Sequence, residues 1–418
     1  MRRSFKYNIL KVLVSILPVL TATSCELFNF GPTTPDQYDK VMLLYSAGFN
    51  NLSGYLKGDI EELKSGYLPT KQSDDVVLVY SHFPSISGYS ATTSPTLIRL
   101  TSAKDNMVVV DTLIQFPVES VSASAEQVEN VLNHVKDLFP ALSYGMIFSS
   151  HATGYLPSGY FQESQDDSGM VEWSSEDECD PQLAPYSIGQ DRVGTTGNYT
   201  SYEIELPDFA AAIPMHLDYL LFDACLMGGV EVAYELKEKV GKVGFSQTEV
   251  LADGFCYGSL TRHLINNDIP DPKGACIDYF HQYETQSGIM QSATISLIDC
   301  SKLSPLAEVC AKLFKKYSYA LDTIDHRKVQ RYFRENKHWF YDLESILVNA
   351  GINEDELNEL YEALDYCVIY KAHTPKFMSE FSIDTFCGLS MYLPVQGSDS
   401  LNTFYKTLKW NQDTGLVN

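Results

Sequence analysis

Two residues that could act together as a nucleophile and a base follow two apolar segments of the chain. His151 closely follows Tyr144–Ser149, and Cys225 closely follows Leu217–Phe222. Both segments have the composition and length of strands buried in a parallel sheet, and the carboxyl ends of such strands share one edge. A thiol reacts as the thiolate, which a neighbouring imidazole can generate or stabilise. The spacing therefore favours a cysteine–histidine pair, whereas either residue alone would more often be structural.

Other histidines are poorer candidates for the base. His216 is the nearest one to Cys225 in the sequence, but the strand between them would separate the two by roughly 30 Å at about 3.3 Å per residue. None of the remaining histidines follows a predicted strand in the way that His151 does. The sequence therefore leaves His151 as the candidate base for Cys225.

The elements that would position this pair alternate between strands and helices. Apolar spacing predicts helices at 52–63, at 124–139 after the capping pair Ser124 and Gln127, and at 229–240. Further strands are predicted at Val41–Tyr45, Val76–Tyr80, Thr96–Leu100, Met107–Leu113, Lys242–Ser246 and Ala293–Ile298. Strands that alternate with helices indicate an α/β fold with a mostly parallel central sheet.

The remaining segments suggest how the 418 residues divide. We expect a signal at 1–24, a tether at 25–38, the α/β core at 39–300, a helical subdomain at 301–376 and a return to the core at 377–418. Within the last part, Gly388–Leu393 resembles a strand and 402–408 a helix. The polar segment 157–198 is expected to be a long loop, which in a compact domain is usually functional.

The first residues have the pattern of an export signal. Four basic residues, Arg2, Arg3, Lys6 and Lys11, precede the apolar run Val12–Ala22. This run is shorter than the roughly 20 residues that a membrane-spanning helix needs. The sequence Ala-Thr-Ser-Cys ending at Cys25 looks like a bacterial lipobox, which predicts lipidation of Cys25 and a location on the cell envelope, anchored to the membrane. A plain cleaved signal peptide with a chance cysteine is the alternative.

Charge and cysteine usage narrow the class of protein. The formal net charge is −24, and removal of residues 1–24 would make it −28, so nucleic acid is not an expected partner. The nine cysteines include no C-x-x-C pair. This spacing argues against a zinc site or a dense disulfide framework, and it favours buried free thiols.

Several segments resemble the clostripain-like cysteine peptidases. The most specific is FDACLMGGVEVAYEL at 222–236, which is similar to the nucleophile segment of that family, and SSHATGYLP at 149–157 is similar to its histidine segment. Weaker similarity covers VMLLYSAGFNNL, VGFSQTEVLADGFCYG and GLSMYLP, so the resemblance extends over most of the chain from Lys40. It implies a caspase-like α/β/α sandwich with an appended helical subdomain, and a catalytic dyad of His151 and Cys225.

One residue departs from the family pattern. The family usually has glycine after the histidine, where this chain has Ala152. Backbone N–H groups of Ala152 and Cys225 could still form an oxyanion hole, but alanine would be strained if the position required a positive φ. A peptidase fold that binds peptides without cutting them is therefore the main alternative. An esterase or transpeptidase that uses the same thiol is a third.

The resemblance also implies a specificity pocket. It maps Asp223 and Asp253 to the floor of a pocket for a basic side chain, which would favour peptide or protein substrates with Arg or Lys before the scissile bond. In the alternative reading, Asp223 caps a helix and Asp253 opens a turn. No cofactor is expected. Some family members need calcium, and the acid-rich segment Glu163–Asp180 is a candidate, although it lacks EF-hand spacing and such charge runs are usually solvated.

Arg192 is the only Lys or Arg in the segment between the two candidate catalytic residues. Clostripain-like enzymes resemble one another in being activated by a cut between these two catalytic residues. A peptidase selective for basic residues would therefore cut itself after Arg192. The alternative is an ordinary surface arginine paired with Asp191.

Overall fold

The computed structural model describes residues 37–85, 93–160, 187–195, 198–334 and 339–418. The predicted signal, most of the tether with Cys25, and the acid-rich segment Glu163–Asp180 lie outside the described residues. Residues 37–418 form one compact unit. None of the described helices is both long and apolar enough to cross a membrane.

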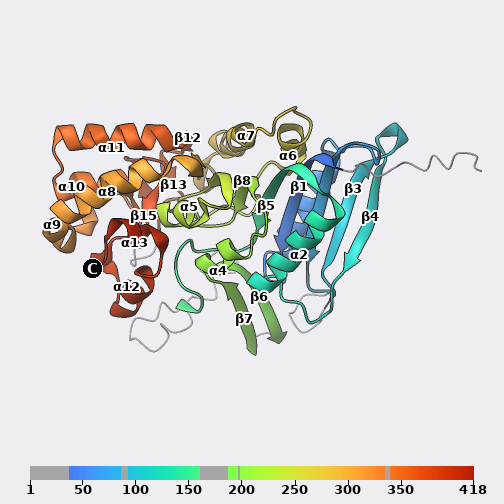
Figure 1. Ribbon diagram of the computed structural model, residues 1–418, viewed down its shortest axis with the longest axis horizontal. Coiled ribbons are helices and arrows are strands. Elements are labelled where there is room, and N and C mark those ends of the chain that lie inside the picture. The colour runs from blue at the N-terminus through green and yellow to red at the C-terminus, as the bar shows by residue number, and fades with distance from the viewer. Residues whose placement is uncertain (1–36, 86–92, 161–186, 196–197, 335–338) are drawn as a thin grey trace, which may run out of the picture. The chain divides into compact units, whose positions relative to one another are not determined.

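A nine-stranded sheet forms the centre of this unit (Figure 1). Five neighbouring strands run parallel in the order β9 (Val240–Phe245), β8 (Leu217–Asp223), β5 (Ala141–Ser149), β1 (Tyr38–Ala47) and β2 (Asp75–His82). Antiparallel pairs extend both sides: β3 (Thr96–Ser102) and β4 (Val108–Gln115) beyond β2, and β10 (Thr294–Asp299) and β12 (Val368–His373) beyond β9. The predicted α/β fold with a mostly parallel sheet is confirmed.

The parallel strands are the continuous apolar runs of the sequence. Residues 41–45 and 76–80 are buried throughout, because helices cover both faces of the sheet there. The strand registers align Ser46 of β1 with Ser149 of β5, and Ser149 with Asp223 of β8. The carboxyl ends of these three strands therefore meet at one edge of the sheet.

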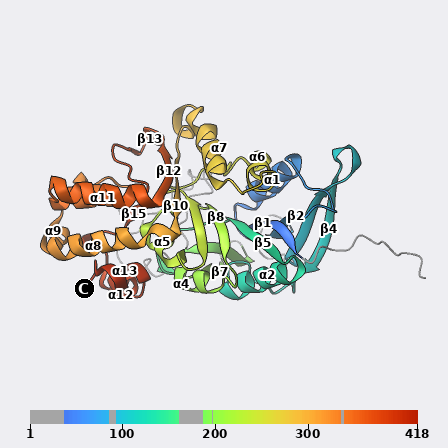
Figure 2. The same ribbon diagram turned by 45° about the horizontal axis from the view of Figure 1, so that its top comes forward.

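Helices pack on the two faces of the sheet (Figure 2). One group contains α1 (Ser53–Ser65), α6 (Tyr257–Leu264) and α7 (Pro272–Glu284), and the other contains α2 (Ala125–Leu138), α4 (Leu206–Ala211) and α5 (Val230–Leu236). Helix α2 begins as its sequence predicts: the Ser124 side chain accepts a hydrogen bond from the Gln127 N–H, and Val128, Leu132 and Val135 face the core.

The C-terminal part is mainly helical. It contains α8 (Ser304–Lys316), α9 (Ser318–Thr323), α10 (Leu343–Ala350), α11 (Glu354–Cys367), α12 (Asp399–Tyr405) and α13 (Lys409–Thr414), with the short pairs β11 (Tyr341–Asp342) with β15 (Ser390–Met391) and β13 (Lys376–Phe377) with β14 (Phe381–Ser382). Strand β12 leaves this part to join the central sheet. The domain boundaries inferred from the sequence stay a prediction.

Two expectations about local structure are corrected. The supposed loop 157–198 contains β6 (Ile188–Thr195), which forms a hairpin with β7 (Asn198–Ile204). The sequence of β6 is polar and lacks the apolar pattern from which strands were predicted. The strand forms because its backbone pairs with β7. The strand expected at Gly388–Leu393 is only the two-residue β15, outside the central sheet. Among the described cysteines, all are free thiols and all except Cys256 are buried, as the sequence indicates.

Candidate active site

The nucleophile candidate lies on a tight turn at the end of β8. The Cys225 side chain is 9% exposed, and the next residue, Leu226, has a φ of 62°. A left-handed conformation at a leucine is strained and is often found at functional sites. Gly154 packs against this turn, since a Cβ there would lie 2.6 Å from the Leu226 carbonyl oxygen. The fold therefore holds the thiol on a constrained turn at the sheet edge.

The Cys225 thiol contacts the backbone of Val250. The Val250 N–H donates to Sγ at 3.3 Å, and the S–H faces the Val250 carbonyl oxygen at 3.9 Å. Burial raises the pKa of the thiol to about 12, and the carboxylate of Glu249 adds to this effect. Glu249 is itself paired with Arg334 at 2.8 Å. The thiol is therefore neutral at physiological pH in this structure.

His151 lies at the end of β5, the strand beside β8. Its ring is 2% exposed, and Nε2 lies 2.7 Å from Oδ1 of Asn51. Burial lowers the pKa of His151 to about 3, and the positive charge of Arg192 lowers it further. A neutral imidazole can accept a proton from a neighbouring thiol.

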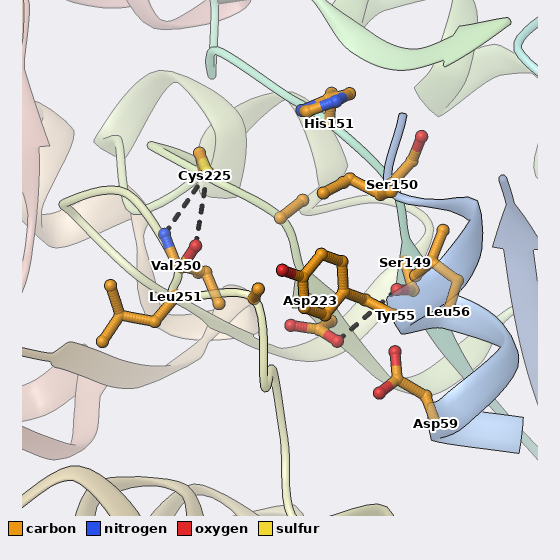
Figure 3. A pocket seen from close by; sticks show the side chains of 13 residues that line it. Tyr55, Leu56, Asp59, Ser149, Ser150, His151, Asp223, Cys225, Val250 and Leu251 are labelled. Carbon is orange, nitrogen blue, oxygen red and sulfur yellow. Dashed lines mark hydrogen bonds between the residues drawn. The ribbon is translucent and has the colours of Figure 1, made fainter. Parts of the chain in front are cut away.

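One pocket contains both residues. Figure 3 shows the thiol of Cys225 and the ring of His151 towards one end of the pocket, with the carboxylates of Asp223 and Asp59 towards the other. The remaining lining comes from four segments: Leu52, Tyr55 and Leu56; Ser149 and Ser150; Ala224; and Val250, Leu251 and Ala252. A thiol beside a neutral imidazole can attack a carbonyl carbon. The carboxylates at the other end of the pocket can bind a cation.

The two carboxylates are buried close to each other. Asp223 accepts hydrogen bonds from the Tyr257 hydroxyl at 2.6 Å and from the Ser149 hydroxyl at 3.4 Å. Gly254, at a φ of 54°, approaches it so closely that a Cβ would meet its oxygen at 2.4 Å. Burial raises the pKa of Asp59 to about 9, with the Asp223 charge next in effect, and burial raises the pKa of Asp223 to about 6. The pair therefore shares a proton at neutral pH.

The other residues singled out in the sequence have different surroundings. Asp253 is exposed and is not part of the pocket lining. Ala152 is buried and is not among the described residues with positive φ, so the expected strain is absent. Neither Ala152 nor Cys225 has an N–H bonded to another described residue.

Arg192 lies in β6 rather than in a loop. Its N–H donates to the Phe49 carbonyl at 2.8 Å, its Nε donates to Gln190 at 3.0 Å, and its guanidinium lies over the Tyr199 ring. Asp191 is buried and accepts from the Ser122 N–H at 2.5 Å. Arg192 is therefore not the exposed arginine of the alternative reading.

Two further histidines deserve comparison with His151. His216 precedes β8, and 60% of its side chain is exposed, so it lies at the opposite end of the strand from Cys225, as expected. His82 ends β2, which corrects the expectation that only His151 follows a strand. Its ring contacts Ser122 at 2.6 Å and the Thr93 carbonyl at 3.1 Å, and it is not part of the pocket lining.

Comparison with known proteins decides the family. The model of the clostripain family, Peptidase_C11, matches residues 44–416. The chain belongs to the clostripain family. Comparison with curated proteins gives no significant match.

Two solved structures of C11 proteases resemble this clostripain-family chain over nearly its full length. An inactive zymogen C11 protease from Parabacteroides distasonis is 26% identical, with a TM-score of 0.73 over 91% of this chain and 99% of that one. A secreted C11 cysteine protease from Bacteroides thetaiotaomicron, in complex with an irreversible peptide inhibitor, is also 26% identical, with a TM-score of 0.70 over 90% and 99%. The caspase-like fold and the membership of a cysteine protease family are thus confirmed.

Sequence reasoning missed two residues of this clostripain-family site, Asn51 and Asp59. Asp59 has a signal in the sequence, because it falls on the apolar face of α1 with Leu56 and Leu63. A carboxylate at such a position is seldom buried without a reason. Asn51 lies in the loop after β1 and has no comparable signal. The described residues contain no cluster of side chains suited to a metal ion.

Proposed function

We propose that this protein is an exported lipoprotein that cuts peptide bonds after Arg or Lys, with Cys225 as nucleophile and His151 as base. The observation that carries the proposal is the single pocket that contains a thiol, an imidazole and two buried carboxylates. The family supplies the reaction class, and the carboxylates supply the preference for a cation.

The mechanism begins from a neutral pair. His151 takes the proton of Cys225 as the sulfur attacks the scissile carbonyl carbon, and the carbonyl oxygen gains the negative charge. Backbone N–H groups of Ala152 and Cys225 hold that oxyanion. The imidazolium then gives its proton to the leaving amine, which breaks the C–N bond. Water, deprotonated by His151, hydrolyses the thioester and returns the thiol.

The buried carboxylates account for specificity. An Arg or Lys side chain that enters the pocket pairs with ionised Asp223 and Asp59, and Arg can do so bidentately. Binding therefore expels the proton that the two acids share. Asp253, which raises the pKa of Asp59 through its charge, acts from outside the pocket lining.

A peptide assay tests the activity. The purified protein is incubated with matched peptides that differ only in Arg, Lys, Gln or Leu before the scissile bond. We expect cutting after Arg and Lys, and none with Cys225→Ala. Absence of cutting by wild type would favour the peptide-binding alternative, for which the burial of the thiol against Val250 is the supporting observation.

The lipid anchor is tested separately at Cys25. Metabolic labelling with a radioactive fatty acid should label wild type but not Cys25→Ala, and wild type should fractionate with membranes. Label in both proteins would contradict lipidation at this residue. Equal release into the medium would contradict anchoring.

Self-processing after Arg192 remains part of the proposal. The charge of Arg192 acts on His151, which supports proximity to the catalytic pair. The pairing of β6 with β7 means that the hairpin must open before the bond after Arg192 can be cut. Intact mass of wild type, Cys225→Ala and Arg192→Gln decides this. We expect two fragments from wild type only, and a full-length, active wild type would contradict it.

A further inference from the structure

We infer that Asn51 is a positioning residue that fixes the orientation and tautomer of His151. This inference rests on the proposed function, because it concerns the same base. The observation is the 2.7 Å contact between Oδ1 of Asn51 and Nε2 of His151. An amide oxygen only accepts hydrogen bonds, so Nε2 of the neutral imidazole carries the hydrogen. Nδ1 is then the nitrogen that carries no hydrogen in the neutral ring, and it can take the proton of Cys225.

The backbone that carries Asn51 is fixed by its neighbour. The Asn50 side chain is 1% exposed and donates to the carbonyl oxygens of Ala47 at 2.9 Å and Gln190 at 2.8 Å. Its Oδ1 accepts from the Leu52 N–H at 2.8 Å. These bonds hold the turn between β1 and α1 on both sides of residue 51. The backbone at residue 51 is therefore held in place, so the Asn51 side chain starts from a fixed position near His151.

The sheet brings this turn beside the histidine. Strands β1 and β5 are parallel neighbours, and Ser46 is level with Ser149. Asn51 and His151 each follow these aligned ends within a few residues. The contact therefore depends on the same strand alignment that places His151 beside Cys225 on the adjacent β8.

The choice of an amide in place of a carboxylate has a chemical consequence. A carboxylate next to an imidazole stabilises the imidazolium and raises its pKa. A neutral amide orients the ring but adds little charge stabilisation, so His151 stays unprotonated and able to act as a base. Once the ring has taken the thiol proton, Asn51 still accepts from Nε2 while Nδ1 gives its proton to the leaving amine.

Kinetics with three variants test this role. Asn51→Leu should lower kcat about 10- to 100-fold, part of the range that acid–base catalysis contributes, and leave KM within about threefold. Asn51→Asp should recover much of that loss and move the acidic limb of the kcat/KM profile up by about one pH unit or more. Asn267→Leu, the same change on an exposed residue, should leave kcat unchanged.

A spectroscopic measurement separates this inference from the proposed function. The ¹⁵N shifts of His151, assigned by comparison with His151→Gln, should show a hydrogen on Nε2 in wild type and a mixture of tautomers in Asn51→Leu. Unfolding curves check that the variants fold, with Asn51→Ala as a second variant. An unchanged tautomer together with a kcat within twofold of wild type would overturn the role. If wild type cuts no peptide, the tautomer result still decides it.

Discussion

Two carboxylates, Asp59 in the pocket and Glu356 in the C-terminal helical part, have pKa values shifted in opposite directions. In the pocket, burial raises the pKa of Asp59 to about 9 and lowers the pKa of His151 to about 3. In the helical part, hydrogen bonds from Lys316 and Tyr317 lower the pKa of the partly buried Glu356 to about 2. The first arrangement costs folding free energy and the second does not. A buried acid with a raised pKa that lies in one pocket with a thiol and an imidazole, as Asp59 does, therefore marks a candidate functional site.

The backbone shows the same contrast. Near Cys225, Leu226 is left-handed. In the helical part, α11 begins with a complete capping box between Asn353 and Glu356, and α10 ends at Gly351 in the left-handed conformation that glycine adopts readily. The ends of α10 and α11 follow the local preferences of the chain, whereas the turn at the thiol departs from them. Four predictions test this contrast between the pocket and the helical part.

The largest effect is expected from the catalytic pair. His151→Ala and Cys225→Ala should each lower kcat at least about 10⁴-fold, because residues that act as one unit fail together. Circular dichroism should show unchanged secondary structure for both. The double variant should be no worse than either single one, and an additive loss would mean that the two residues act separately.

The second effect concerns the preference for basic residues. Asp223→Asn should reduce kcat/KM for Arg substrates about 10²-fold or more, because it leaves a buried cation without its main partner, and Asp59→Asn should reduce it about tenfold. Cutting of neutral peptides should change little. The family resemblance maps Asp253 to the pocket, so Asp253→Ala is the matched comparison. If Asp253→Ala lowered kcat/KM for Arg substrates more than Asp59→Asn did, Asp253 rather than Asp59 would be the second acid that binds the basic side chain.

The third effect is a pH dependence of stability. The pKa of Asp59 is raised in the folded state above that in the unfolded chain, so the folded state binds more protons between about pH 4 and pH 9. The free energy of unfolding should therefore fall as the pH rises through this window, by at most about 1.4 kcal/mol per pH unit for one proton. Denaturant unfolding of Cys225→Ala, with and without Asp59→Asn, measures the slope. If the free energy of unfolding depended on pH equally with and without Asp59→Asn, the folded state would not hold an extra proton at Asp59.

The smallest effect is expected in the helical part. Asn353→Ala removes the side-chain cap of α11 and should lower the free energy of unfolding by about 1 kcal/mol. It should leave kcat/KM and its pH profile unchanged, because α11 contributes nothing to the pocket lining. A changed pH profile in this variant would link the helical part to catalysis and weaken the contrast drawn above.

Much of the framework can be predicted from the sequence because its signals are local. The parallel strands coincide with apolar runs, and His151 and Cys225 each come two residues after the end of β5 and β8. The predicted strand Lys242–Ser246 corresponds to β9, which pairs in parallel with β8, as a mostly parallel sheet requires. Strand β12 was missed, because its short apolar run Val368–Tyr370 follows directly on the last residue of the long helix α11.

Only the tertiary structure decided what surrounds the catalytic pair. It placed Asp59 of α1 against Asp223 of β8, set Asn51 against His151, and turned the segment around Arg192 into a strand. The sequence by itself determined which side chains were available and which strands would present them. The state of protonation depends on burial and on neighbours far away in the chain, and those exist only once the sheet and its helices have packed.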